Sequence, residues 1–364
     1  MNNPRTIEGR WWIHGGDKPP CFGVLSLDPE EKLVLSAKTL QNRTVEETWR
    51  ALEQNHTVAE VIHGTDEDNR DVTLFGCFCP KYKPSTGLDS HEISCLAGIL
   101  NHKGTSCDEP RFRAVSVGYT FLDEWMNQHP VKDSKIEQDE MAVKLKFGGT
   151  FDFNPYDGVR IKIQGKTTAS STLGGFSYDT KFRVWFLLAQ PKSANEIRKE
   201  YIPIFLRLLC LLTNERIFAE DINFYAQDPF TATGSDEPQP SELLCTNHGI
   251  TKAKQKTSAS RMYATFNDVA SGFESVLSRW FECYERMRPV MDLHFAVFSD
   301  FITGYQTEFL LLAQALEVYH SRSTLFSSTE TSEEKHQERL SRILQSAPTE
   351  RANKSVIISI QYCP

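Results

Sequence analysis

The sequence lacks an apolar run long enough to cross a membrane. Its longest such run, residues 201–212, is interrupted by Pro203 and Arg207, whereas a membrane-spanning helix needs about 20 apolar residues. Residues 1–7 contain no apolar segment of the kind that forms the core of a signal peptide. Membrane proteins and secreted proteins are therefore both disfavoured.

An excess of positive charge is missing as well. The net charge is −8 and the pI is about 5.7, so no broad basic surface for nucleic acid is indicated, although a local basic patch is compatible with these values. The nine cysteines are an odd number in a chain without a secretion signal, which indicates reduced thiols. We therefore expect a cytoplasmic protein.

Several signatures of catalysis are absent. The sequence has no Gly-x-Ser-x-Gly elbow, no His-Glu-x-x-His helix and no phosphate-binding loop. Residues of the types that bind metals gather in one stretch of the sequence: Cys77, Cys79, His91, Cys95, His102 and Cys107. Their spacing does not match the paired ligands of a zinc site. We expect neither a metal ion nor another cofactor.

Period-two alternation and turn signals dominate the first 190 residues. Strands are predicted over residues 11–13, 21–27, 32–37, 58–64, 71–78, 112–121, 141–147, 159–165 and 182–189, with short ones near 217–225 and 243–245. Residues 167–172 are predicted to be a polar loop, and residues 45–54 have a helical pattern. Many short strands with small helical insertions favour an antiparallel, sandwich-like domain over a parallel sheet.

Helical patterns follow. The capping box Ser193-x-x-Glu196 predicts a helix near 194–213, which Pro203 should kink or restart. Apolar spacings of three and four residues predict helices over about 266–284 and 309–320, with His320 as a core or interface residue, and a charged helix after Thr331. The fold class is thus α+β, with a β-rich domain over 1–227, a linker over 228–258 and a helical domain over 259–364.

Segments along most of the chain resemble one family. Residues 9–13, 23–30, 61–66, 72–77 and 112–125 resemble the ApeA N-terminal domain, and residues 280–282 and 309–322 resemble the opening helices of an ApeA-like HEPN domain. The resemblance implies a bacterial anti-phage protein of the abortive-infection type, with a β-rich sensing or regulatory domain and a HEPN RNA endonuclease that needs no metal. It also implies RNA as substrate, dimerisation through the helices and a phage-derived protein as the candidate trigger.

The resemblance implies, too, an Arg-x4–6-His motif on a late helix that serves the RNA cut. No such motif follows His320. Earlier matches are Arg50 with His56 and Arg288 with His294, and composition alone predicts roughly one or two matches. Arg288 and His294 are the better-placed catalytic candidates, although Pro289 lies between them. We expect the chain to end before the catalytic motif and to show little RNA cleavage.

Three hypotheses stay open. The first is an ApeA-type defence protein with an incomplete HEPN part. The second is a non-enzymatic β-sandwich module that binds a carbohydrate or protein ligand and carries a helical oligomerisation segment. The third is a gene that continues in another reading frame beyond the tail at 354–364. An incomplete helical part predicts exposed apolar side chains at Phe309, Leu312 and Leu316, and hence self-association or partner binding.

Overall fold

A computed structural model describes residues 5–13, 21–27, 33–40, 59–83, 88–101, 110–128, 131–137, 140–145, 149–172, 175–231, 239–245, 257–297 and 304–322. The chain forms two compact units, each built from three separate stretches. Unit 1 comprises Met1–Val115, Pro191–Asn195 and Asp221–Lys254, and unit 2 comprises Ser116–Gln190, Glu196–Glu220 and Gln255–Pro364. The predicted helix at 45–54 and the helix after Thr331 lie outside the described residues.

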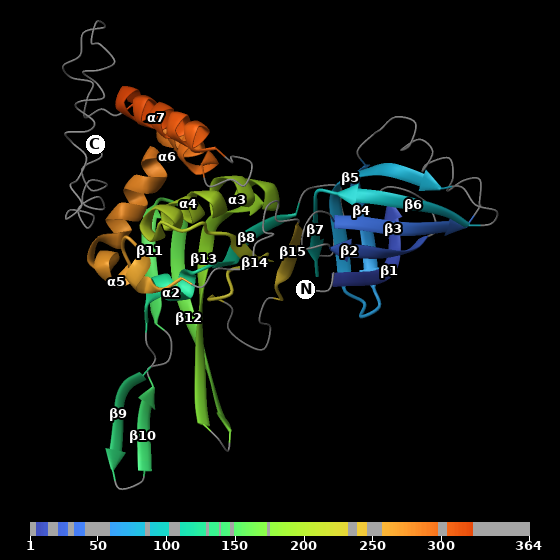
Figure 1. The fold of residues 1–364 in the computed structure, drawn as a ribbon. Helices are drawn as coiled ribbons and strands as arrows, with labels where there is room; N and C mark the ends of the chain where they lie inside the picture. Colours follow the sequence, from blue (N-terminus) through green and yellow to red (C-terminus); the bar gives the residue numbers. More distant parts are fainter. Residues whose placement is uncertain are drawn as a thin grey trace, which may run out of the picture. The chain divides into compact units, whose positions relative to one another are not determined.

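Unit 1 is an antiparallel sheet that closes on itself (Figure 1). Its strands are β1 (Arg5–Ile13), β2 (Cys21–Leu27), β3 (Leu33–Leu40), β4 (Ala59–Asp66), β5 (Asp71–Lys83), β6 (Leu88–Cys95), β7 (Ala97–Leu100) and β15 (Ser241–Cys245). They lie in the order β15-β7-β5-β4-β1-β2-β3-β6, and β6 pairs with β5 to close the sheet. Closure depends on the length of β5, whose first part pairs with β7 and whose second part pairs with β6.

The core of unit 1 lies inside this closed sheet. All eight strands contribute side chains to this core, and Trp11, Leu35 and Leu74 have no exposed surface. Gly64 lies opposite Trp11 on the neighbouring strand, and a Cβ added there would come within 2.3 Å of the indole ring. The large Trp11 side chain therefore needs glycine at this position.

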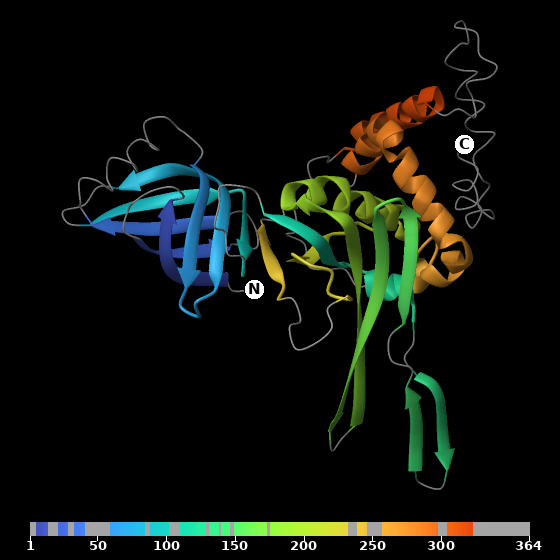
Figure 2. The same cartoon turned by 180° about the vertical axis from the view of Figure 1, so that it is seen from behind.

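Unit 2 contains a second part of the sheet, in the order β11-β12-β13-β8-β14, and a separate hairpin of β9 and β10. The strands are β8 (Arg111–Tyr119), β9 (Val131–Glu137), β10 (Glu140–Leu145), β11 (Thr150–Tyr156), β12 (Val159–Thr172), β13 (Gly175–Ser193) and β14 (Ala219–Tyr225). Strands β8 and β14 each run from one unit into the other. Figure 1 and Figure 2 show β12 and β13 continuing beyond β11 as a two-stranded arm.

Residues 167–172, predicted to be a polar loop, belong to this arm, so that prediction is wrong. Strand pairing continues to Thr172 opposite Gly175. Hydroxyl groups face each other across the arm, with 2.9 Å between the oxygens of Thr167 and Thr180 and 2.7 Å between those of Ser170 and Ser177. These cross-strand hydrogen bonds let a polar sequence form strand, because pairing partners matter as much as hydrophobicity in a sheet.

The helices belong mainly to unit 2. They are α2 (Leu122–Met126), α3 (Ala194–Glu200), α4 (Ile202–Thr213), α5 (Phe266–Val269), α6 (Phe273–Ala296) and α7 (Tyr305–Arg322), with 3-10 turns η1 (Ala259–Arg261) and η2 (Ala270–Gly272). The helical stripe after Ser193 is divided at Tyr201, just ahead of Pro203. The predicted class, a β-rich N-terminal part followed by helices, is confirmed. In place of two separate layers, the β-rich part has a sheet that closes around its core.

Aromatic side chains hold α5 and the start of α6 against the sheet of unit 2. Phe266 lies 4.6 Å from Phe151, and Phe273 lies 5.1 Å from Phe153, measured between ring centroids in edge-to-face geometry. The Trp125 indole donates a 3.0 Å hydrogen bond to the carbonyl of Ala264. Buried aromatic pairs of this kind add to the free energy gained by burial alone.

Burial along β8, the strand predicted at 112–121, does not follow a simple alternation. Arg113 is exposed, whereas Phe112 is buried and stacks on Phe224 with 4.8 Å between the ring centroids. Further along, Ser116 and Val117 are both fully buried although they lie on opposite faces. This strand lies between β13 and β14, and a central strand covered on both faces shows no simple alternation.

None of the helices in the described ranges is both long and apolar enough to span a membrane.

Candidate functional site

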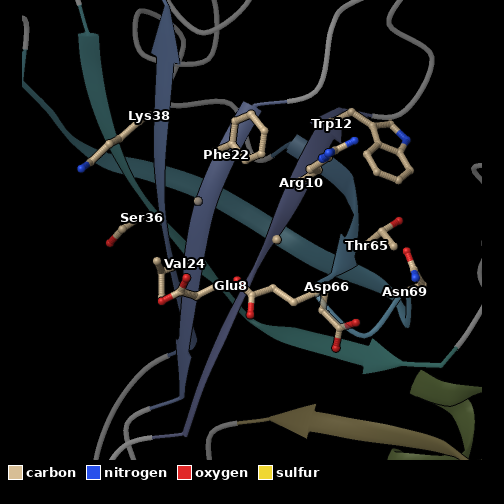
Figure 3. Close-up of a pocket in the computed structure, with 13 residues that line it drawn as sticks. Glu8, Arg10, Trp12, Phe22, Val24, Ser36, Lys38, Thr65, Asp66 and Asn69 are labelled. Atoms are coloured by element: carbon tan, nitrogen blue, oxygen red, sulfur yellow. The ribbon is translucent and has the colours of Figure 1, made fainter.

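A groove of about 840 Å³ lies on the outer surface of the closed sheet in unit 1 (Figure 3). Strands β1, β2 and β3 form its floor, and the turn between β4 and β5 forms one wall. This volume falls in the range typical of ligand-binding pockets. We call it the outer groove and treat it as the candidate functional site.

Alternation along the strands determines which side chains reach the outer groove. Ile7 and Trp11 point into the core, so Glu8, Arg10 and Trp12 of β1 point outward. On β2 the outward residues are Phe22 and Val24, and on β3 they are Ser36 and Lys38. The strand register places Arg10 opposite Phe22, and Phe22 opposite Lys38. A cation, an aromatic ring and a second cation thus lie side by side across three strands.

Two opposing glycines bring these strands close together. Gly9 and Gly23 pair across β1 and β2. A Cβ at Gly9 would lie 2.5 Å from the carbonyl oxygen of Thr65, and a Cβ at Gly23 would lie 2.7 Å from that of Ser36. Both distances are far shorter than van der Waals contact, so only glycine permits this approach.

Phe22 is the most unusual residue of the outer groove. It is 65% exposed, although a phenylalanine side chain stabilises a protein by about 1.5–3 kcal/mol when buried. The Arg10 guanidinium carbon lies 5.5 Å from the centre of its ring, in cation–π geometry. The half-buried Trp12 ring lies 6.2 Å from His63 of β4. Exposed aromatic and arginine side chains in one groove are typical of a binding surface.

Acidic residues lie on the opposite side of the outer groove. Figure 3 shows Lys38, Phe22, Arg10 and Trp12 along one side, and Glu8 and Asp66 along the other. Asp66 is buried and accepts two 2.7 Å hydrogen bonds from Arg70, one from its backbone N–H and one from its Nε. This ion pair closes the β4–β5 turn, so the Asp66 carboxylate is already neutralised.

Arg288 and His294 both lie on α6, which continues through Pro289. Residues six apart on a helix are separated by about 9 Å along its axis and about 120° around it. The Arg288 guanidinium is exposed and lies 3.7 Å from Glu285 and 3.9 Å from Asp292. His294 is half-buried, its ring lies 5.0 Å from Phe295, and desolvation lowers its pKa. None of these named contacts joins Arg288 to His294.

Two cysteines of the candidate zinc cluster, Cys77 and Cys95, lie in the core of unit 1. Cys77 and Cys95 are both buried, and hydrogen bonding to the Cys95 thiol, together with burial, raises the pKa of the Cys77 thiol. His91 is also buried, while His102 and Cys107 lie outside the described residues. Within the part of the chain that the structure describes, no group of three or more His, Cys, Asp or Glu side chains is arranged to hold a metal.

Sequence reasoning missed the outer groove. Trp11 and Trp12 are adjacent in the sequence, and adjacent residues of a strand point to opposite faces. Trp11 is fully buried and Trp12 lines the groove. Placing Phe22 beside Arg10 requires the pairing of β1 with β2, which the sequence pattern does not specify. His320, by contrast, is buried as predicted.

Comparison with known proteins gives one family. The model of the family described as ApeA N-terminal domain 1 matches residues 6–280. The matched range contains every residue that lines the outer groove, and it ends within α6. No curated protein and no solved structure matches the chain.

Proposed function

Because the chain belongs to the ApeA N-terminal domain 1 family, we propose that it acts in bacterial anti-phage defence of the ApeA type. The family match over most of the chain carries this proposal. Unit 1 has the sensing or regulatory role, and the outer groove supports that role because it presents exposed aromatic and charged side chains on a rigid closed sheet.

Helices α6 and α7 form the first part of a HEPN-type helical scaffold that self-associates. One face of α7 packs on α6 around Met287, Val290 and Ala315. Another face carries Tyr305, Phe309, Leu312 and Leu316, and Phe309 is 71% exposed. Spacings of four, three and four residues form the apolar stripe of a helix that packs on another helix. The exposure predicted for Phe309, Leu312 and Leu316 is thus confirmed, and it supports self-association of the chain.

RNA is the proposed target of the defence response. Helix α6 supports the helical scaffold and does not supply the residues that cut the RNA. The ion pairs of Arg288 with Glu285 and Asp292, together with the desolvation of His294, argue against these two residues as the cutting pair. We therefore expect little RNA cleavage by the purified chain in the presence of EDTA. Robust cleavage that His294→Ala abolishes would contradict this assignment.

A plaque assay tests the defence proposal. Bacteria that express the chain should reduce the plating efficiency of at least some phages in a diverse panel, relative to an empty vector. Leu312→Glu should weaken both this protection and self-association measured by sedimentation, because it places a charge on the apolar stripe. Gln314→Glu, at an exposed position outside the stripe, is the matched control. If every phage in the panel plates on these bacteria as efficiently as on bacteria with the empty vector, the proposal is contradicted.

The outer groove also favours a second candidate, a ligand-binding module with no nuclease connection. Its mixed charges and exposed Phe22 are compatible with such a role. The two candidates differ in the plaque assay, because the binding module predicts ligand binding without protection from phage.

A further inference from the structure

The outer groove is well suited to a ligand that carries both signs of charge. Two cationic side chains, Arg10 and Lys38, lie along the aromatic side, and the acidic residues Glu8 and Glu67 belong to the opposite side. All four are exposed. Since Arg70 neutralises Asp66, the remaining charges balance.

This balance argues against nucleic acid as the ligand. A nucleic-acid surface needs an excess of Lys and Arg along the path of the phosphates, because phosphate contacts supply most of the affinity. In the outer groove, an RNA strand that reached Arg10 and Lys38 would bring its next phosphates toward Glu8 and Glu67. A protein segment meets no such conflict, because its side chains can carry opposite charges a few residues apart.

The aromatic side chains indicate what lies between those charges. Phe22 is 65% exposed and Trp12 is half-buried, and both line the outer groove beside Arg10. Arginine and aromatic residues of this kind are the usual anchors of protein–protein interfaces, where flat side chains are covered by an apolar partner. Because the strands are rigid and already paired, the side chains need little reorganisation on binding.

We propose that the outer groove binds an extended segment of a phage-derived protein. An acidic side chain of that segment pairs with Arg10 and Lys38, a basic side chain pairs with Glu8 and Glu67, and an apolar or aromatic side chain between them packs on Phe22 and Trp12. This inference rests on the proposed function for the origin of the partner, whereas the chemistry of the segment follows from the outer groove itself.

Selection from a phage-displayed library of random 12-residue peptides on the full-length chain tests the chemistry. Enriched peptides should carry an acidic, an apolar or aromatic, and a basic residue within a few positions of one another. Their Kd, measured by fluorescence anisotropy, should rise at least about tenfold with Phe22→Ala and with Lys38→Glu. Replacing the acidic peptide residue by lysine should restore binding to the Lys38→Glu variant.

Matched controls come from the arm of unit 2. Tyr178 is 42% exposed, and the Lys181 side chain is 75% exposed. Tyr178→Ala therefore removes an exposed aromatic ring outside the outer groove, and Lys181→Glu repeats the charge reversal there. Both should leave the Kd unchanged. The groove proposal is overturned if no peptide is enriched, or if the groove variants and the control variants bind equally well. It is also overturned if a labelled 20-nucleotide poly(A) RNA binds and Lys38→Glu abolishes that binding.

The plaque assay separates the two proposals. If Phe22→Ala abolishes peptide binding but protection is unchanged, the groove binds a protein segment that is not the trigger, which overturns its assigned origin. If the chain gives no protection while the peptides bind as expected, the defence proposal fails and the chemistry of the outer groove stands. Loss of both peptide binding and protection in the same variants supports both proposals.

Discussion

Phe273 at the start of α6 provides a demanding test of how the helices are attached in unit 2. Its side chain is fully buried, and its ring lies 5.5 Å from Trp125, 5.1 Å from Phe153 and 5.7 Å from Phe266. Truncating a buried phenylalanine to alanine costs about 3–5 kcal/mol, since transfer free energy is lost and a cavity remains. We expect Phe273→Ala to lower the free energy of unfolding of unit 2 by about 4 kcal/mol.

Far-UV circular dichroism at 222 nm reports this loss, because α4, α5, α6 and α7 all belong to unit 2. For a unit of this size, about 4 kcal/mol corresponds to a fall in Tm of about 8–16 °C. Tyr263→Ala is the matched control, because Tyr263 is 50% exposed and exposed truncations change stability by about 0.5 kcal/mol or less. Equal shifts in the two variants would refute the aromatic attachment of α5 and α6.

Three further predictions concern the described core. Burial raises the pKa of the Cys21 and Cys210 thiols to about 11 from an ordinary value of 9.0. The unfolded chain therefore loses these protons first, and urea midpoints should fall between about pH 9 and 11, less steeply in Cys210→Ala. Gly64→Ala should destabilise unit 1 by about 1–3 kcal/mol in urea unfolding, because its Cβ would overlap Trp11. Arg207→Met should lower the free energy of unfolding by about 1–3 kcal/mol in the same measurement, because Arg207 links α4 to a tyrosine hydroxyl and a carboxylate of α6. A urea midpoint equal to that of the wild type would contradict this.

Local signals located many of the secondary structure elements. Strand β2 spans Cys21–Leu27 as predicted, because Asp28-Pro29 provides a turn immediately after it. The capping residue Thr265 and its partner Asp268 begin α5 close to the predicted helix start. In each of these cases residues close in sequence are sufficient to specify the structure.

The sequence pattern did not predict strands β6 and β7, and for β6 the reason is physical. His91, Ile93 and Cys95 point inward and are buried, but the residues between them are polar and one of the inward residues is a histidine. The segment becomes strand because β3 pairs with it on one side and β5 on the other. Such neighbours are distant in sequence, so local propensity underestimates the strand.

The outer groove likewise depends partly on local sequence signals and partly on pairing between distant strands. The alternation of Ile7, Glu8, Arg10 and Trp11 already separates inward from outward positions on β1. The groove itself requires Phe22 to lie opposite Arg10, and it requires Gly9 and Gly23 to let neighbouring strands approach. Arg288 and His294 match a spacing in the sequence, and on α6 Arg288 lies beside Glu285 and Asp292 while His294 lies beside Phe295.

By itself the sequence determined the class of this protein, its family and the positions of several strands and helices. Periodicity, turn residues and helix caps act over a few residues, and they remain legible without a structure. Tertiary structure alone decided that β5 and β6 close the sheet, that each unit is assembled from three stretches, and that Arg10, Phe22 and Lys38 share one surface. These features depend on which distant strands pair to bury apolar surface, and that choice is a property of the whole chain.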